Sequence, residues 1–433
     1  MQYIPNILFA LVLVSAIVFF TKNVKKLIRN IKLGRSVDRS DNPSERWNNM
    51  MYVALGQSKM VRRPVAGILH ILVYAGFIII NIEVLEIIID GLFGTHRIFS
   101  FLGPVYSFLI GAFEVLGVLV LLSVIIFWIR RMVLRIPRFW NKEMKGFPKN
   151  DALNILYFEM VLMLLFLIMN ATDVSFQQAN TGNVISGFIA PLFTGFEAET
   201  LHIIERAAWW LHIIGILIFL NYLYYSKHLH ILLAFPNTFY ANLSPKGKFN
   251  NLVSVTKEVK MMLDPNVDPF AAPAEPDSNE AVEKFGVEDV TDLTWVQLLN
   301  AYTCTECGRC SSVCPANQTG KELSPRAIMM KTRDRIEEVG KNIDKNGTFV
   351  ADGKSLLDTI TQEEIWACTS CNACVEECPV NIDPLSIIVD MRRFLVMEKS
   401  AAPQELNIMM TNIENNGAPW QYNQMDRLNW KDE

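Results

Sequence analysis

Apolar residues are concentrated in five long stretches, all of them before residue 230. They run over residues 4–20, 65–89, 105–129, 152–169 and 207–225. Each is close to the roughly 20 residues that a helix needs to cross the hydrocarbon core of a bilayer. A buried core or a signal peptide is the other interpretation, but five stretches with charged flanks and no cleavage pattern after the first argue against it. We therefore predict five transmembrane helices.

Positive charges follow the first and third stretches. Eleven Lys and Arg residues lie between the first and second, and seven lie between the third and fourth, whereas the other connections carry few. Because positively charged loops stay in the cytoplasm, we predict an outside N-terminus and a cytoplasmic location for everything after the fifth helix. Residues 24–47 alternate basic and apolar positions, which predicts contact with an anionic membrane surface or a solvated loop.

The rest of the chain has a different pattern. Residues 264–280 are rich in proline and lack an apolar period, which is typical of a linker, and helical periodicity returns from about residue 291. A hydrophobic content of 51% over the 433 residues therefore reflects the N-terminal part. We predict an all-α protein with four parts: a transmembrane domain (1–240), an interfacial segment and linker (241–290), a cysteine-rich domain (291–400) and a partner-binding tail (401–433).

All eight cysteines lie in two runs with the spacing C-x2-C-x2-C-x3-C-P. This spacing is typical of two [4Fe-4S] clusters, in which the fourth cysteine of each run ligates the cluster of the other run. The first set is then Cys304, Cys307, Cys310 and Cys378, and the second set is Cys368, Cys371, Cys374 and Cys314. Zinc ligation is the alternative. Reduced thiols belong in a reducing compartment, which agrees with a cytoplasmic domain.

Six histidines are candidates for haem ligands. His212 and His230 are 18 residues apart, which predicts one face of a continuous helix and a separation of about 27 Å. His70, in the second span, is at the depth of His230. We predict a bis-histidine haem b between His70 and His230, and His212 is the candidate ligand of a second, outer haem. The less favoured candidates are His228, His202 and His96. The alternative for each is a histidine that only forms hydrogen bonds in the membrane.

The membrane half resembles a known family. Five spans and a last segment that reads Trp209-Trp210-Leu211-His212 through His228-Leu229-His230 are similar to the cytochrome b (gamma) subunit of respiratory nitrate reductases and to the membrane subunit of heterodisulfide reductases. The resemblance implies a five-helix cytochrome b-like bundle with haem ligands on helices two and five. This chain has His70 on helix two, but the position of the other helix-two ligand falls near Ile80.

The cysteine-rich half resembles a second family. Helices predicted before and after the two cysteine runs are similar to the α-helical ferredoxin domain of succinate dehydrogenase iron–sulfur subunits and heterodisulfide reductases. Residues 412–420 resemble the segment that leads into cysteine-rich CCG domains in fused heterodisulfide-reductase-like oxidoreductases, although an unstructured polar tail is the alternative. Because the sequence has no further cysteine, we expect such chemistry to belong to another polypeptide or to be absent.

Carboxylates inside the predicted spans are the remaining candidates. Intramembrane carboxylates are costly and are usually functional, so Glu83, Glu86 and Glu159 are candidates for a proton path to quinone. For each of them, pairing with a neighbouring Arg or Trp is the alternative.

These features predict a membrane electron-transfer subunit of the bacterial inner membrane. We expect it to connect a cytoplasmic redox partner with the membrane quinone pool through two [4Fe-4S] clusters and haem b, as part of a quinone-linked oxidoreductase whose substrate-side catalysis is on the partner. The resemblance implies menaquinone and a soluble partner such as an electron-transfer flavoprotein or a CCG-domain iron–sulfur protein. The sequence has no stripe of basic and aromatic residues, so it does not predict nucleic-acid binding. The alternatives are a haem-free membrane ferredoxin for metal-centre assembly or repair, and a passive anchor with structural clusters.

Overall fold

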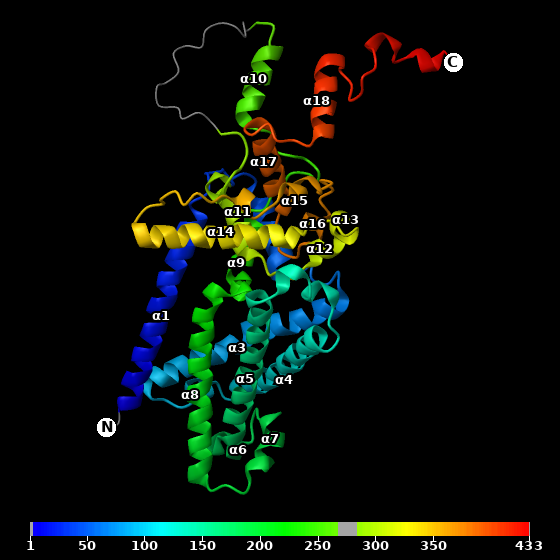
Figure 1. Ribbon diagram of the computed structural model, residues 1–433. Coiled ribbons are helices and arrows are strands. Elements are labelled where there is room, and N and C mark those ends of the chain that lie inside the picture. The colour runs from blue at the N-terminus through cyan, green and yellow to red at the C-terminus, as the bar shows by residue number, and fades with distance from the viewer. Residues whose placement is uncertain (1–2, 267–283, 433) are drawn as a thin grey trace.

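The computed structural model describes residues 3–266 and 284–432, and within these ranges it contains helices and turns but no strand. The all-α prediction is therefore confirmed. Five helices are long and apolar enough to cross a membrane, as the hydrophobic pattern predicts. They are α1 (Ile4–Ile31), α3 (Pro64–Phe93), α4 (Pro104–Met132), α5 (Phe147–Thr172) and α8 (Ala198–Tyr222). In Figure 1, α3, α4, α5 and α8 form the lower half of the molecule, and α1 leans along one side.

Glycines allow close packing of the long helices. A Cβ atom on Gly76 of α3 would lie 2.4 Å from Val120 of α4, and one on Gly91 would lie 2.7 Å from the ring of Phe9 on α1. Small residues at helix contacts are typical of membrane bundles, because lipid tails supply no hydrophobic drive and close packing must hold the helices together. The outward faces of α1 and α3 are rich in exposed Ile, Leu, Val and Phe, as expected for helices in contact with lipid.

The end of the bundle far from the cysteine-rich domain is closed by the short helices α6 (Val174–Ala179) and α7 (Ser186–Ile189). Arg97 organises this end, because its guanidinium donates hydrogen bonds to Asp173 and Asn170 at 2.9 Å. Buried Glu114 of α4 accepts hydrogen bonds from the backbone N–H groups of Ile185 and Ser186 at the start of α7. The charged groups at this end are therefore largely paired.

The fifth membrane helix does not continue through His230, which corrects the prediction that His212 and His230 share one helix. α8 ends at Tyr222, two 3-10 turns follow (Leu223–Tyr225 and Lys227–Leu229), and α9 (His230–Phe239) begins a new helix. Ser226 is extended, and its side chain accepts a hydrogen bond from the His228 N–H. The Asp151 carboxylate accepts bonds from the Tyr222 hydroxyl and the Lys227 N–H, which stabilises the break.

The cysteine-rich domain lies on one end of the bundle, and α14 runs across it in Figure 1. Its helices are α11 (Trp295–Thr303), α12 (Arg309–Val313), α13 (Pro315–Gln318), α14 (Pro325–Asn346), α15 (Gln362–Trp366), α16 (Ala373–Glu377) and α17 (Pro384–Met397). Buried residues of α11, α14 and α17, including Leu298, Ile328 and Ile388, form one apolar core with Leu27 of α1.

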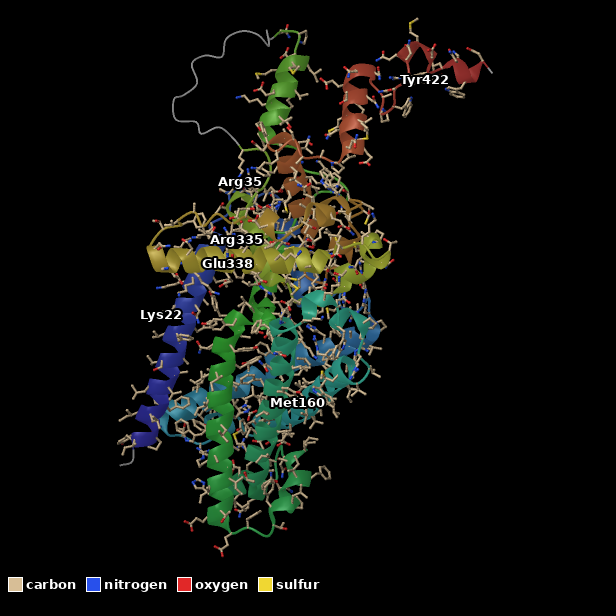
Figure 2. The ribbon with its side chains drawn as sticks, in the orientation of Figure 1. Lys22, Arg35, Met160, Arg335, Glu338 and Tyr422 are labelled. Atoms are coloured by element: carbon tan, nitrogen blue, oxygen red, sulfur yellow. The ribbon has the colours of Figure 1, made fainter. Side chains whose placement is uncertain are left out.

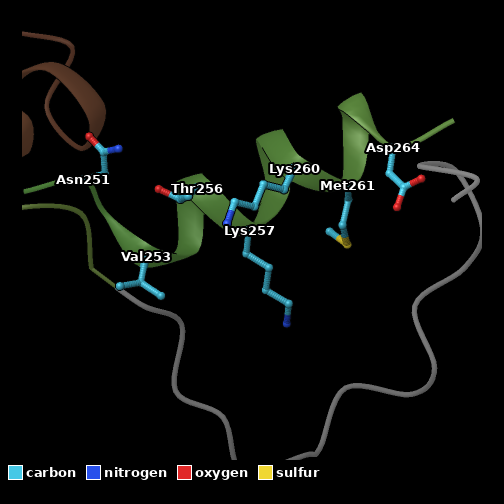
Figure 3. Close-up of a pocket in the computed structure, with 7 residues that line it drawn as sticks. All are labelled: Asn251, Val253, Thr256, Lys257, Lys260, Met261 and Asp264. Atoms are coloured by element: carbon cyan, nitrogen blue, oxygen red, sulfur yellow. The ribbon is translucent and has the colours of Figure 1, made fainter. Parts of the chain in front are cut away.

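Three further helices complete the described chain: α2 (Pro43–Met50), α10 (Val253–Leu263) and α18 (Gln404–Asn416). α10 and α18 project from the domain at the top of Figure 1. Figure 3 shows the open surface along α10, where Val253 is exposed beside Lys257 and Met261. Most of the predicted linker, from residue 267 to 280, lies outside the described residues. α18 gives the start of the predicted tail a helical structure.

Residues 24–47 were expected at the membrane surface or in solution, and the structure places much of this segment against the cysteine-rich domain instead. Buried Asn30 donates a hydrogen bond to the Tyr302 hydroxyl at 2.9 Å, and the Trp295 N–H donates one to the Arg35 carbonyl at 3.1 Å. Lys26 and Arg29 both pair with Asp344 of α14. Figure 2 shows Arg35 close to α14, where Arg335 is labelled, and Lys22 farther down α1. These basic residues therefore join two parts of the protein.

Candidate functional site

The two cysteine loops have the same backbone shape. In the first loop Glu306 and Gly308 have positive φ (53° and 70°), and in the second Ser370 and Asn372 have positive φ at the matching positions (56° and 60°). Each loop then enters a short helix, α12 or α16, which ends at a cysteine followed by proline. Because the residue before proline avoids the helical region, Cys314 and Cys378 are extended, with ψ of 118° and 124°.

The fold brings the cysteines together in two sets. One small cavity is lined by Cys304, Cys307 and Cys310 of the first run together with Cys374 and Cys378 of the second, so the last cysteine of the second run does lie beside the first three of the first run. Helices α12 and α16 pack against each other, which makes this exchange possible. Among the described residues, no three His, Cys, Asp or Glu side chains are placed to hold a single metal ion.

The thiols of the second set are close enough to shift one another's pKa values. Burial raises the pKa of Cys368, and the neighbouring Cys314 and Cys371 raise it further. Burial also raises the pKa of Cys374, with further contributions from Asp383, Cys368 and Cys314. Cys314 therefore lies among the cysteines of the second run.

Arg326 packs against the first cysteine loop. Its side chain is fully buried, and it donates hydrogen bonds to the Arg138 carbonyl and the Glu143 carboxylate, both at 2.7 Å. A Cβ on Gly308 would lie 2.4 Å from Arg326, so the lack of space favours glycine here, whereas Asn372 has a similar φ at the matching position of the second loop. Backbone N–H groups of Ser370 and Ile382 lie 3.4 and 3.3 Å from the sulfurs of Cys368 and Cys378.

A buried charge bridge joins the first cysteine loop to the membrane helices. Glu306, which is 3% exposed, pairs with Lys227 after α8 and with Arg333 of α14, the latter at 2.8 Å. Lys227 also lies 3.7 Å from Asp151 of α5. Burial alone would raise the pKa of Glu306, but Lys227 and Arg333 outweigh it and hold that pKa below its usual value. The loop is thereby fixed to the end of α8.

His70 and His230 lie together at the same junction. Their ring centroids are 6.3 Å apart, with 41° between the ring planes. Nδ1 of His230 is 3.1 Å from the Lys227 carbonyl, whereas Nδ1 of His70 is buried and has no hydrogen-bond partner among the described residues. The ring of His228 lies 5.4 Å from that of His230, and its Nε2 is 3.7 Å from Glu159.

A cavity of about 200 Å³ connects these histidines with the first cysteine loop. Its lining includes His228 and His230 on one side and Thr305, the residue after Cys304, on the other. Arg130, Arg131, Arg138 and Lys227 also line it. Nη1 of Arg131 is buried and has no hydrogen-bond partner among the described residues, so this cavity has an unusual concentration of positive charge.

The other histidines lie elsewhere. His212 is buried on α8, where its Nδ1 is 3.0 Å from the Leu162 carbonyl and its ring lies 6.2 Å from Phe166. His96 is half exposed, at 3.1 Å from Asp173, and His202 is 72% exposed beside Glu205. The structure therefore brings His70, His228 and His230 together and places His96 and His202 at the far end of the bundle.

The three candidate carboxylates have different surroundings. Glu86 accepts hydrogen bonds from the Phe99 N–H at 2.8 Å and the Tyr106 hydroxyl at 3.0 Å. Glu83 is 3% exposed, and its Oε2 has no partner among the described residues. Both line a second cavity, of about 350 Å³, together with Phe9, Trp209 and other residues at the far end of the bundle. Glu159, by contrast, lies beside His228 at the junction.

Sequence reasoning did not single out Lys227, Glu306, Arg333 or Arg326. One signal was available, because Glu306 is a charged residue inside a cysteine loop and Lys227 stands between a membrane helix and two histidines. Their pairing could not be read from the sequence, since 79 residues separate Lys227 from Glu306.

Comparison with protein families finds a match within the cysteine-rich domain. Residues 300–382 match the 4Fe-4S dicluster domain family. This range contains both cysteine runs, and the match supports 4Fe-4S clusters in this segment, as the cysteine spacing predicts. No solved structure matches the chain.

Two relatives match the chain over nearly its whole length, and a third matches a shorter part. A probable iron–sulfur-binding oxidoreductase (FadF) of Bacillus subtilis is 30% identical over 99% of this chain and 61% of its own length. An EtfAB:quinone oxidoreductase of Syntrophomonas wolfei is 25% identical over 99% of this chain and 59% of its own length. A probable membrane-anchored ferredoxin of Chromohalobacter salexigens is 36% identical over 36% of this chain and 25% of its own length.

The chain thus spans about three-fifths of the length of the first two relatives. Components of heterodisulfide reductases match shorter parts. One from the dihydromethanophenazine-dependent enzyme of Methanosarcina mazei is 26% identical over 33% of this chain and 35% of its own length. The homologues are therefore iron–sulfur oxidoreductases and membrane-anchored ferredoxins, which supports an electron-transfer role.

Proposed function

We propose that this protein passes electrons between a soluble redox partner and a quinone in the membrane through two [4Fe-4S] clusters and haem b. One observation carries the proposal: Thr305 of the first cysteine loop and His230 line the same cavity, and the ring of His230 lies 6.3 Å from that of His70. Two kinds of redox centre would thus be adjacent across the junction. The name of the Syntrophomonas relative, an EtfAB:quinone oxidoreductase, agrees with a quinone and an electron-transfer flavoprotein as partners.

For the clusters, we assign one ligand set to Cys304, Cys307, Cys310 and Cys378 and the other to Cys368, Cys371, Cys374 and Cys314. The shared cavity of the first set and the mutual electrostatic effects within the second support this assignment. When bound, such clusters supply one-electron carriers. The chain's own part is to hold the sulfurs, to direct N–H groups at Cys368 and Cys378, and to keep the first loop attached to the membrane helices.

The His70–His230 pair fits a haem iron. A metal–imidazole bond of about 2 Å and a distance of roughly 1.1 Å from a ring nitrogen to the ring centre place two axial imidazoles with their centroids about 6.3 Å apart. The observed separation is 6.3 Å. The Lys227 carbonyl would orient His230 through Nδ1, leaving Nε2 for the metal. The arginines of the adjacent cavity suit the two negatively charged propionates of a haem.

We propose one haem per chain at this pair. His212 forms a hydrogen bond with a backbone carbonyl and packs on Phe166, and this suffices to explain a buried histidine. His212 therefore stays a candidate whose replacement tests for a second haem, and His228, His202 and His96 stay less favoured.

For the quinone, we propose the cavity at the far end of the bundle. It combines aromatic and aliphatic walls with a few convergent polar groups, as small-molecule sites do. Among its carboxylates, Glu83 has an oxygen without a partner among the described residues and can exchange a proton with a bound head group, whereas both oxygens of Glu86 are in use. We place this end outside and the iron–sulfur domain in the cytoplasm of a bacterial cell, with menaquinone as the quinone and the tail (401–433) near the soluble partner.

A difference spectrum of the purified protein tests the proposal. We expect dithionite-reduced minus oxidised spectra to show a b-type haem, at one per chain by pyridine haemochrome. His230→Ala should lose this signal and keep the broad iron–sulfur absorbance, whereas His202→Ala should keep both. An intact iron–sulfur protein without haem would overturn the proposal and favour the assembly or repair factor.

A further inference from the structure

One cysteine differs from the other seven in its exposure. Cys371, in the loop of the second run, is exposed, whereas Cys304, Cys314, Cys374 and Cys378 are buried and the remaining three are intermediate. In a protein whose redox centres are otherwise covered, an exposed ligand marks the place where a second protein can approach closest. The surface around Cys371 is therefore where an external electron carrier should dock.

A groove begins beside this cysteine. Asn372, the next residue, lines a cavity of about 580 Å³ that is also bounded by Tyr52, by the segment 241–250 and by α17. Its charged lining is mainly basic, with six Lys or Arg residues and two Asp residues. These are Arg39, Lys59, Arg62, Lys246, Lys248 and Arg393, against Asp383 and Asp390. The chain as a whole has a net charge of −4, so this basic groove departs from the overall charge.

The pairing of these groups leaves positive charge in the groove. Glu376 is shared between Arg62 and Lys246, and Asp390 pairs with Arg393. The pKa of Lys59 is lowered, mainly by burial and further by Lys246 and Arg62, although Cys378 and Glu376 act in the opposite direction. Lys246 and Lys248 are exposed at the edge of the groove. Lys246 pairs with Glu376 of α16, the short helix that follows Cys371 in the chain.

We infer that the basic groove beside Cys371 is the docking surface for an acidic face of the soluble redox partner. This inference rests on the proposed function and adds to it the place of contact and the charge of the partner. Complementary charge raises association rates by 10- to 1,000-fold at low ionic strength, which suits a transient electron-transfer contact. The partner therefore carries Asp and Glu residues around its own redox centre.

Small redox ions can test this without an identified partner. Protein reduced with dithionite, freed of excess reductant and held in neutral-lipid nanodiscs, is mixed in a stopped-flow instrument with ferricyanide or with hexaammineruthenium(III). Each oxidant takes one electron from the protein, so ferricyanide becomes ferrocyanide and ruthenium(III) becomes ruthenium(II). The rate is followed by the recovery of iron–sulfur absorbance. Neutral lipid removes anionic headgroups as competitors for the groove.

We expect Lys246→Glu with Lys248→Glu to slow oxidation by the ferricyanide anion at least about tenfold at low salt and to speed oxidation by the ruthenium cation. The difference should fade at 0.5 M salt, where the Debye length is only a few Å. The matched control is Lys341→Glu with Lys345→Glu, the same charge change on exposed lysines of α14, and it should alter neither rate by more than about twofold.

The outcomes separate this inference from the proposed function. If the groove variant and the control change both rates equally, the groove is not where electrons leave, and the inference fails while the clusters remain. If dithionite does not bleach the iron–sulfur absorbance of the wild-type protein at all, the proposed function itself fails.

Discussion

Replacing Glu306 with Gln tests whether the buried charge bridge holds the iron–sulfur domain to the membrane helices. The change keeps the shape of the side chain but removes its charge. Lys227 then keeps only the longer contact with Asp151, at 3.7 Å, and Arg333 keeps only the exposed Asp334, at 3.3 Å. Both partners are largely buried, with 8% and 18% of their side chains exposed. We expect the domain to become markedly less stable and to lose its clusters sooner on heating.

The magnitude follows from the geometry. The 2.8 Å contact between Arg333 and Glu306 corresponds to a gross attraction of about 6 kcal/mol at an effective dielectric constant of about 20. Desolvation of the charges offsets much of this, and removing one partner of a buried pair typically costs about 3–5 kcal/mol. For a domain of about 110 residues each kcal/mol lowers the melting temperature by roughly 4 °C, so such a loss lowers it by roughly 12–20 °C.

The assay is thermal loss of iron–sulfur absorbance at one fixed heating rate, because unfolding of such a protein is irreversible and its apparent melting temperature depends on the rate. Glu338→Gln is the matched control, since Glu338 lies on α14 near Arg335 (Figure 2) and pairs with it at 49% side-chain exposure. Because Glu338 is half exposed and Arg335 keeps Asp289 and Asp352 as partners, loss of this contact should cost about 0–1 kcal/mol. Equal melting of both variants would refute a stabilising role for the bridge.

The difference in melting temperature between wild type and Glu306→Gln should depend on pH. Because the pKa of Glu306 is lowered in the folded state, its charge stabilises the fold above the unfolded value of about 4.5, and this contribution is lost as the pH falls through the folded pKa. The melting difference between wild type and Glu306→Gln should therefore be full at pH 7 and should shrink below about pH 4.5. A difference that grew in acid would contradict this sign.

Two further changes have defined outcomes. Gly308→Ala should lower the cluster content of the purified protein at least about twofold, because a Cβ at this position would lie 2.4 Å from Arg326 on a backbone with positive φ. Gly320→Ala is the control, since Gly320 has a similar φ (82°) but open space around it. Equal iron content in the two variants would contradict the steric argument. Glu83→Gln should slow quinol-driven reduction of the haem by about 100-fold or more, because the amide cannot exchange the proton. The control Glu199→Gln, at an exposed position of the same end, should leave the rate unchanged. An unchanged rate in Glu83→Gln would remove Glu83 from the proton path.

Much of this protein could be predicted from local sequence pattern. The five membrane helices follow from the length of their apolar stretches, and the two cysteine loops follow from spacing together with Gly308, Asn372 and the prolines after Cys314 and Cys378. Even the exchange of the fourth cysteine was predicted, because the motif itself requires it. The one continuous helix expected for His212 and His230 was wrong, since Asp151, far away in the sequence, stabilises the break at Ser226.

What the sequence by itself determined is therefore the set of elements and the type of redox chemistry, because hydrophobic period, turn residues and cysteine spacing act over a few residues. Only the tertiary structure decided which distant groups meet. It placed His228 beside His230, closed the charge bridge from Lys227 to Glu306, and left Cys371 exposed beside a basic groove. Such contacts depend on the packing of whole helices against each other, and no local pattern carries that information.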